Sequence, residues 1–181
     1  MYKRQKYGDV LPSNKALAGA GIELIGMERR EFLLKDALDR IKDRYDFLFI
    51  DCPPSLELLT LNALCAADAI LVPVQGEYYA LEGLSDLMNT VRIVRRSLNP
   101  RLELDGVLLT MFDGRTNLAL QVAEEVKHYF PGKVYATVIP RNVRLSEAPS
   151  HGKPITAYDR TSRGAEAYTA FAAEFLKKQS A

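Results

Sequence analysis

The segment YDFLFIDCPPS (residues 45–55) sets the first expectation about the fold. In this segment an apolar run, residues 47–50, leads directly into Asp51 and is followed by Pro53 and Pro54. An unbroken apolar run that ends in a turn signal is typical of a strand buried on both faces, as in a parallel sheet. The prolines cannot continue a hydrogen-bonded ladder, and they stiffen the turn. We therefore expect a buried strand with Asp51 held at its carboxyl end.

Downstream of this segment, strand and helix patterns alternate. Apolar runs predict further strands at residues 69–74, 104–111 and 133–140. Apolar residues at steps of three and four predict helices at residues 56–66, 80–98, 116–126 and 162–178, and Thr116 and Ser162 are candidate N-caps. Apolar strands separated by amphipathic helices indicate an α/β fold, a doubly wound and mostly parallel sheet with helices on both faces.

In a doubly wound sheet, ligands bind at the carboxyl ends of the strands. Asp51, the turn TMFDGR (110–115) and the turn PRN (140–142) all fall at that edge. A carboxylate in this position, beside a phosphate site, holds Mg²⁺ through water. Two structural readings stay open: Asp51 as the cap of a helix that starts near Ser55, and PRN as a plain turn from strand to helix.

Before Tyr45 the pattern is less regular. We expect a strand at residues 22–26 and a helix at residues 31–43, and we therefore expect the chain to begin inside an α/β unit. A phosphate site would need a glycine-rich loop, and the best formal match is GIELIGME (21–28). Met27 and Glu28 stand where Lys and Ser/Thr belong, and therefore we reject this segment as a P-loop.

Composition excludes several classes of protein. The chain has 181 residues, of which 48% are hydrophobic, and a net charge of +1, so any polyanion site must be local. The N-terminus lacks the apolar centre of a signal peptide, and no apolar run approaches the length of a membrane span. Cys52 and Cys65 form no metal-binding or redox motif. These features favour a cytoplasmic protein with free thiols.

Four blocks of sequence carry a resemblance to a known family. They are YDFLFIDCPPSLELLTLNAL, VPVQGEYYALEGLSDLMNTV, GVLLTMFDGRTNL and VIPRNVRLSEAPSHGKPITAYDRTSRGAEAY. In this order they resemble the ParA/Soj group of chromosome- and plasmid-partitioning ATPases, relatives of MinD, from about Val10 to the C-terminus. The resemblance implies that Asp51 is the Walker B acid, which orders Mg²⁺ through water. It also implies that Pro140 and Asn142 contact adenine, and that Arg115 and Arg144 bind DNA without sequence preference.

The resemblance further implies cofactors, partners and a location. Such a protein binds ATP and Mg²⁺, forms a homodimer in the ATP-bound state and binds nonspecific double-stranded DNA. It hydrolyses ATP when a ParB/Spo0J-type protein engages it, acts on the nucleoid in the cytoplasm and does not use a membrane. We expect any contact with DNA to be made to phosphates and to weaken with salt.

The family begins with a strand and a P-loop that carries two lysines, and neither is found in these 181 residues. We therefore expect a single domain, residues 1–181, with a P-loop NTPase-like fold that lacks its first strand and P-loop. The lysines would neutralise charge that develops on the phosphates, so we expect this chain to be nearly inactive as an ATPase. Residues 1–5 have no counterpart in the family, and their codons permit a sequencing-library adapter, which favours a non-native origin.

Other functions compete with this interpretation. A MinD-like membrane-associated positioning ATPase would need a basic amphipathic helix with an exposed apolar face. A P-loop-less, non-enzymatic module would bind partners without hydrolysis. An iron-protein relative would need cluster cysteines, and Cys52 and Cys65 occupy no such pattern. Arg115 and Arg144, finally, each have a plain reading as solvated surface residues.

Overall fold

The computed structural model describes residues 3–5, 8–53, 55 and 57–180. The chain divides into two compact units. Unit 1 comprises Met1–Asp68 and Thr90–Leu102, and unit 2 comprises Ala69–Asn89 and Glu103–Ala181. Helix α4 (Tyr79–Ser97) contributes to both units. Whether the chain acts as a single domain stays a prediction.

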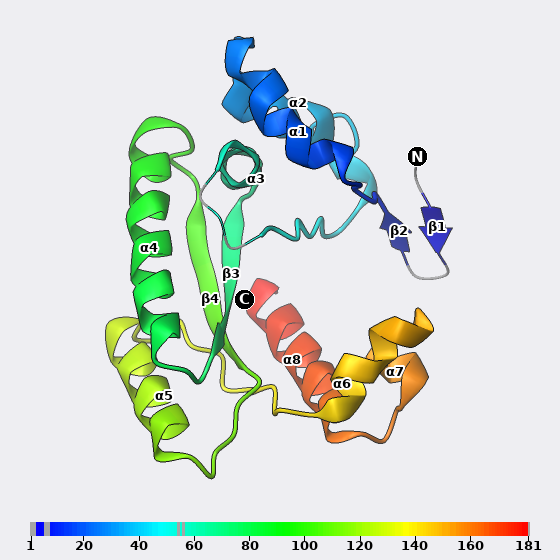
Figure 1. Ribbon diagram of the computed structural model, residues 1–181, viewed down its shortest axis with the longest axis vertical. Helices are drawn as coiled ribbons and strands as arrows, with labels where there is room; N and C mark the ends of the chain where they lie inside the picture. The colour runs from blue at the N-terminus through cyan, green and yellow to red at the C-terminus, as the bar shows by residue number, and fades with distance from the viewer. Residues whose placement is uncertain (1–2, 6–7, 54, 56, 181) are drawn as a thin grey trace. The chain divides into compact units, whose positions relative to one another are not determined.

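Unit 2 is built on two parallel strands, β3 (Ala69–Gln75) and β4 (Glu103–Thr110), which α4 connects (Figure 1). The register pairs Ala69 with Glu103 and Gln75 with Thr110, with one irregularity between Ile70 and Leu71. Helix α5 (Asn117–Tyr129) follows β4, and its N-cap Thr116 accepts a hydrogen bond from the Ala119 amide at 3.3 Å. The predictions for both strands, for α4 and for the start of α5 are confirmed.

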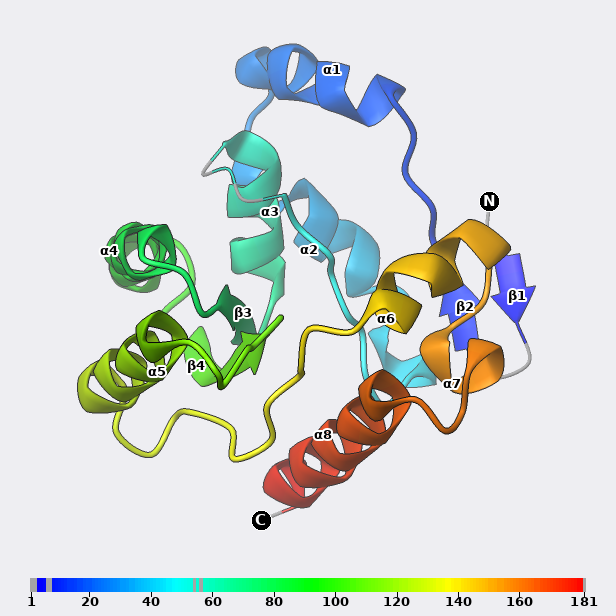
Figure 2. The ribbon, with the colours of Figure 1, turned by 60° about the horizontal axis from the view of Figure 1, so that its bottom comes forward.

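Both faces of this sheet are covered, as a doubly wound fold requires. On one face, Val107 and Leu109 of β4 pack in a buried cluster with residues of α4 and α5, including Leu84 and Val126. On the other face, Leu108 packs with residues of helix α8 (Arg163–Gln179), as the alternation of side chains along a strand dictates. Figure 2 shows α5 and α8 on opposite sides of the two strands. The predicted α/β fold class is confirmed.

The predicted strand at residues 133–140 forms only in part. It is bridged in parallel to β4 at Val134 and continues to a second bridge between Phe112 and Pro140. Between these bridges, the amides of Ala136 and Thr137 donate instead to the Glu174 carboxylate on α8, at 2.7 and 2.8 Å. A side chain therefore replaces the ladder in the middle of this segment.

The remaining elements of unit 2 are short and lie before α8. They are α6 (Val143–Glu147), the 3₁₀ helix η4 (Ala148–His151) and α7 (Ile155–Tyr158). Ser162 accepts a hydrogen bond from the Ala165 amide at 3.2 Å and so caps α8 as predicted. Gly164 is required where α8 meets α6, because a Cβ there would lie 2.6 Å from Leu145 Cγ.

Unit 1 is mainly helical. Its elements are the antiparallel strands β1 (Lys3–Gln5) and β2 (Gly8–Val10), helices α1 (Ala16–Glu23), α2 (Leu33–Leu38) and α3 (Leu58–Ala66), and the 3₁₀ helices η1 (Leu24–Gly26), η2 (Arg30–Phe32) and η3 (Lys42–Arg44). The buried side chain of Asn62 on α3 joins three segments of this unit. It accepts from the Leu34 amide at 3.1 Å and donates to the carbonyls of Arg30 and Leu58.

The predicted buried strand at residues 47–50 is wrong. These residues form no strand, and Phe47 and Phe49 are 43% and 74% exposed. A parallel strand needs neighbours that supply hydrogen bonds, and the ladders among the described residues are only β1–β2 and β3–β4. The expected rigid turn involves Pro54, which lies outside the described residues.

Two further predictions in unit 1 are corrected. Residues 22–26 form the end of α1 and η1, not a strand, because a short apolar run fits either structure and a helix satisfies its hydrogen bonds locally. The helix expected at residues 31–43 is broken into η2, α2 and η3. The segment rejected as a P-loop is thus largely helical.

Candidate functional site

Asp51 lies in unit 1, in an exposed segment without regular structure. It does not cap the following helix, because α3 begins after Glu57, whose side chain makes no capping hydrogen bond. Partial burial and the charge of Asp51 raise the pKa of the neighbouring Cys52 thiol, so this exposed cysteine stays protonated near neutral pH. Of the two structural readings left open by the sequence, the capping role for Asp51 is therefore wrong.

The surroundings of Asp51 restrict how it can bind a metal. No group of three or more His, Cys, Asp or Glu side chains that could hold a metal ion occurs among the described residues. Mg²⁺ is commonly bound through one or two carboxylates together with water and substrate phosphates. A single exposed carboxylate fits that arrangement, in which most of the ligands come from the nucleotide and the solvent.

The turn after β4 lies at the carboxyl edge of the sheet in unit 2. Met111 has a φ of 48°, in the left-handed region that non-glycine residues seldom adopt. The next residue, Phe112, donates its amide to the Ile139 carbonyl at 3.1 Å and accepts from the Arg141 amide at 3.2 Å. These bonds hold the turn at 110–115 beside the turn at 140–142.

Arg115 is tied to a carboxylate two residues before it. Its Nε and Nη2 atoms donate to the two oxygens of Asp113 at 2.8 and 2.7 Å, and its amide donates to Asp113 Oδ1 at 3.1 Å. The hydrogen bonds from the Arg115 side chain, and then from its amide, lower the pKa of Asp113 to about 2. The pair is therefore charged at any physiological pH, although the Arg115 side chain is 89% exposed.

Asn142 is the N-cap of α6. Its Oδ1 accepts from the Arg144 amide at 2.9 Å, which fixes the orientation of the side-chain amide. Within the part of the chain that the structure describes, its Nδ2 has no hydrogen-bond partner. The half-buried Pro140 lies two residues earlier, at the bridge to Phe112. This turn therefore combines an apolar ring with an available hydrogen-bond donor.

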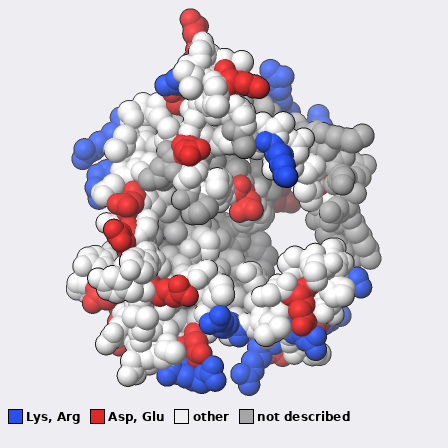
Figure 3. Space-filling model, in the orientation of Figure 1, with Lys and Arg blue, Asp and Glu red and all other residues white. Residues whose placement is uncertain are grey.

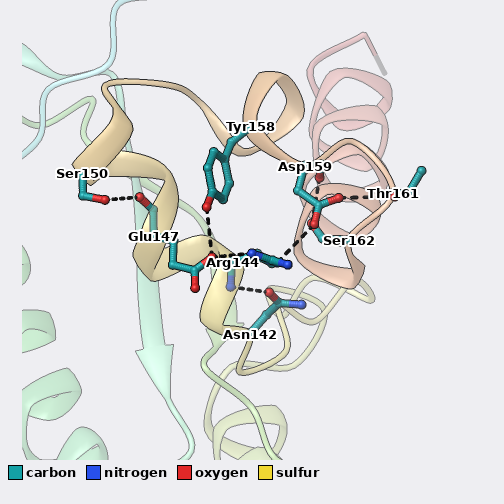
Figure 4. A network of polar contacts seen from close by, with 8 residues as sticks. All are labelled: Asn142, Arg144, Glu147, Ser150, Tyr158, Asp159, Thr161 and Ser162. Carbon is teal, nitrogen blue, oxygen red and sulfur yellow. Dashed lines mark hydrogen bonds and ion pairs between the residues drawn. The ribbon is translucent and has the colours of Figure 1, made fainter.

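Arg144 is the centre of a polar network (Figure 4). Its Nη1 donates to Glu147 Oε2 at 2.8 Å, and its Nε lies 3.4 Å from Asp159 Oδ2. The Tyr158 hydroxyl also donates to Glu147, at 3.1 Å. The hydrogen bond from Arg144, and then that from Tyr158, lower the pKa of Glu147, while the same pairing raises the pKa of Arg144. The network joins α6 to the end of α7 and to Asp159, in the segment that leads to α8.

Comparison with known proteins identifies the family. A family model described as an AAA domain matches residues 1–104. The chain is 64% identical over 166 residues to the sporulation initiation inhibitor protein Soj of Bacillus subtilis (strain 168), covering 92% of this chain and 66% of that protein. It is 54% identical over 173 residues to the chromosome partitioning protein ParA of Myxococcus xanthus (strain DK1622), covering 96% and 61%. The chain belongs to the ParA/Soj family.

A solved structure supports the fold of this ParA/Soj-family chain. It is that of cobyrinic acid a,c-diamide synthase from Mycobacterium smegmatis with bound ADP and magnesium. The TM-score is 0.83 at 36% sequence identity, and the match covers 99% of this chain and 67% of that one. The chain spans 61–66% of the length of the two curated relatives above. No described helix is long and apolar enough to cross a membrane.

Within unit 2, the ParA/Soj-family chain brings together four of the residues singled out from the sequence. Pro140 and Asn142 lie in one turn, and Arg144 follows it on α6. Arg115 ends the turn at 110–115, which the backbone bonds of Phe112 hold beside the turn at 140–142. Asp51 belongs to unit 1. The roles inferred from the resemblance stay predictions.

The acidic partners of the two arginines were not anticipated from the sequence. The spacing of Arg144 and Glu147, three residues apart on a helix, is a recognisable signal for an ion pair. Asp113 and Arg115 are two residues apart in a turn, and this spacing does not by itself predict an ion pair. Asp159 is remote in sequence, so only the tertiary structure reveals its contact with Arg144.

An apolar cavity in unit 2 lies apart from these residues. Its volume is about 290 Å³, and it is lined by Leu109, Lys127, Phe130, Gly132, Val134, Tyr135, Ala136 and Val138. None of the residues predicted to contact nucleotide or DNA lines it. The cavity is therefore separate from the residues predicted to contact nucleotide or DNA.

Proposed function

We propose that this chain belongs to a partitioning ATPase that binds ATP and Mg²⁺, dimerises with ATP bound, binds nonspecific duplex DNA and responds to a ParB/Spo0J-type partner. The observation that carries the proposal is the 64% identity to Soj of Bacillus subtilis over 92% of this chain. The protein would work on the nucleoid in the cytoplasm. The proposal concerns the whole protein, of which this chain carries the described units.

Asp51 is proposed to orient water bound to Mg²⁺. An exposed carboxylate with no competing hydrogen bond from a helix terminus is free to accept from such water. When bound, Mg²⁺ neutralises charge on the β- and γ-phosphates of ATP. Replacement by Asn would keep the size and remove the negative charge, so the metal would be held more weakly.

Pro140 and Asn142 are proposed to contact the adenine base. The Nδ2 of Asn142 is directed away from its capping bond and can donate to a ring nitrogen. Pro140 offers an apolar surface, and its backbone is held by the bridge to Phe112. A pre-positioned turn of this kind binds a base with little loss of conformational entropy.

Arg115 and Arg144 are proposed to contact DNA phosphates. Both are exposed on unit 2, and both carry carboxylate partners that phosphates would have to displace. Exposed ion pairs contribute about 0–1 kcal/mol, so this exchange costs little. A membrane-binding role is less well supported, because Phe171 and Phe175 of α8 pack against the sheet instead of forming an exposed apolar face.

ATP hydrolysis tests the proposal. We expect the purified chain to hydrolyse ATP at background rate, because it contains no P-loop lysine. A chimera that carries the N-terminal segment of Bacillus subtilis Soj ahead of the matched region is expected to hydrolyse ATP when duplex DNA and a ParB/Spo0J-type protein are added. Asp51→Asn in the chimera should lower the rate about 100-fold or more, by loss of charge stabilisation around Mg²⁺.

Two results would contradict the proposal. A folded chimera without ATPase activity in the presence of duplex DNA and a ParB/Spo0J-type protein would exclude the enzymatic assignment. Hydrolysis by the chain alone, abolished by Asp51→Ala, would show that catalysis does not need the P-loop lysines. Asp43→Asn, which removes an exposed carboxylate elsewhere in unit 1, is the matched control and should leave the rate of the chimera unchanged.

A further inference from the structure

Arginines from three separate loops gather at one edge of unit 2. Arg115 follows β4, Arg141 and Arg144 follow residues 133–140, and Arg160 and Arg163 precede or begin α8. The bridge of Phe112 to Pro140 joins the first two loops. The contact of Arg144 with Asp159 joins the second to the third. Figure 3 shows Lys and Arg side chains along the lower margin, where these loops lie in Figure 1.

These arginines fall into two classes. Arg115 and Arg144 are bound to the carboxylates of Asp113, Glu147 and Asp159. Arg141, Arg160 and Arg163 are exposed, and none has an ion-pair partner within 4.0 Å among the residues that the structure describes. Arg141 exerts only a weaker electrostatic attraction on the Asp113 carboxyl. The three unpaired cations therefore keep charges that no described carboxylate neutralises by direct contact.

Arg163 is also in an electrostatically unfavourable place. It is the first residue of the 17-residue helix α8, and the N-terminus of a helix carries partial positive charge. A cation is disfavoured here, and Glu166, the acidic residue of the same first turn, makes no ion pair with Arg163 within 4.0 Å among the described residues. A phosphate beside Arg163 would interact favourably with both the guanidinium and the helix terminus.

We propose that Arg141, Arg160 and Arg163 make the first contacts of this chain with the phosphates of duplex DNA. This inference rests on the proposed DNA-binding function and names residues that the family resemblance did not. Unpaired cations release counterions from DNA without first losing a protein ion pair. Arg115 and Arg144 would contact phosphates later, after the phosphates have displaced their carboxylate partners.

The test measures binding of the 181-residue chain, and of the chimera described above with ATP and Mg²⁺, to a fluorescent 24-base-pair duplex of random sequence. The salt concentration is varied between about 20 and 150 mM, the range over which phosphate contacts are most evident. Arg141→Ala, Arg160→Ala and Arg163→Ala should each weaken low-salt binding about threefold or more. Each should also lower the slope of log K against log salt by about one. Arg→Lys at the same positions keeps the charge and should restore the slope.

Arg95→Ala is the control, since Arg95 is exposed on α4 in unit 1, and it should leave the slope unchanged. If the unaltered protein binds duplex, as the chain alone or as the ATP-bound chimera, but the three alanine variants keep its slope, this inference is overturned while DNA binding stands. If neither the unaltered chain nor the ATP-bound chimera binds duplex at low salt, the proposed DNA-binding function itself fails. Circular dichroism of each variant separates loss of binding from loss of folding. Where an Ala variant does not fold, the salt slope of the Lys variant at the same position decides the outcome.

Discussion

At the scale of single residues, the charge that each arginine offers at the carboxyl edge depends on the carboxylate with which it is paired. The Arg115 side chain is 89% exposed, yet one edge of its guanidinium, Nε and Nη2, is hydrogen-bonded to Asp113. Exposure alone is therefore a poor guide to availability. The electrostatic character of the carboxyl edge is set by pairs such as this one.

Asp113→Asn is expected to strengthen DNA binding. Asparagine keeps the Oδ1 that accepts from the Arg115 amide, so the turn survives, but it releases the guanidinium. Low-salt affinity for duplex should rise several-fold, and the salt slope should increase by up to about one. Asp43→Asn makes the same change in net charge in unit 1 and should have a smaller effect; equal effects of the two variants would show that the ion pair does not restrain Arg115.

The pH dependence of this pair follows from its lowered pKa. With a folded-state pKa of about 2 and an ordinary value of 3.8, Asp113 contributes to stability above pH 3.8 and loses that contribution as the pH falls through about 2. Between pH 5 and 8 it stays ionised. Titration of Asp113 should therefore not change DNA affinity in that range.

At the scale of elements, α8 is fastened to the sheet by polar contacts as well as by its apolar face. In its middle, Glu174 accepts from the amides of Ala136 and Thr137. At its end, Lys178 donates to the Asp105 carbonyl, and Gln179 Nε2 donates to Asp105 Oδ1 at 2.8 Å. Glu174 thereby satisfies two backbone donors of residues 133–140 that form no ladder bond to β4.

Glu174→Gln is expected to destabilise the chain by about 1 kcal/mol, because a neutral amide offers one acceptor oxygen to two amides. Burial raises the pKa of Glu174, but hydrogen bonds from Thr137 and Ala136 and the charge of Lys178 outweigh it, so the net pKa is lowered. The stabilisation is thus present above pH 4.5 and is lost as the pH falls through the lowered value.

Urea unfolding followed by circular dichroism at pH 7 and at pH 3 measures this effect. The difference between the unaltered chain and Glu174→Gln should shrink at the lower pH. Glu125→Gln, at an exposed position on α5, should change the free energy of unfolding by less than about 0.5 kcal/mol. A difference for Glu174→Gln that does not depend on pH would rule out the charged acceptor as the cause.

At the scale of the whole molecule, two compact units share the long helix α4. Within unit 1, the buried side chain of Asn99, just beyond α4, donates to the carbonyls of Leu64 and Ala67 at 3.0 and 2.8 Å. These carbonyls lie at the end of α3, where the helix has no further amides to satisfy them. Asn99 therefore fixes the packing of unit 1.

Asn99→Ala is expected to destabilise unit 1 by about 1–3 kcal/mol, because it leaves buried carbonyls without donors. Hydrogen exchange should accelerate in α3 and remain slow in β3 and β4. Asn117→Ala, at the exposed first residue of α5, should have little effect on either. Equal acceleration in both units would show that they unfold together.

Much of unit 2 could be predicted from the sequence because its signals are local. The apolar runs of β3 and β4, the helical spacing of α4 and the caps Thr116 and Ser162 depend on neighbours within a few residues. The same holds for Asn142, which lies at the turn where the sequence placed it. Propensity, periodicity and capping act over short distances, so they can be recognised without the fold.

Other features were decided only by the tertiary structure, because they depend on hydrogen-bond and ion-pair partners that are distant in sequence. Residues 47–50 have the composition of a buried strand, but a strand exists only where another segment supplies hydrogen bonds. Residues 133–140 were interrupted as a strand because Glu174, far along the chain, took two of their amides. The sequence by itself determined the family, the α/β class and the local elements of unit 2. Tertiary contacts decided which apolar runs became strands and which arginines kept a free charge, since hydrogen bonds and ion pairs form only where folding brings donor and acceptor together.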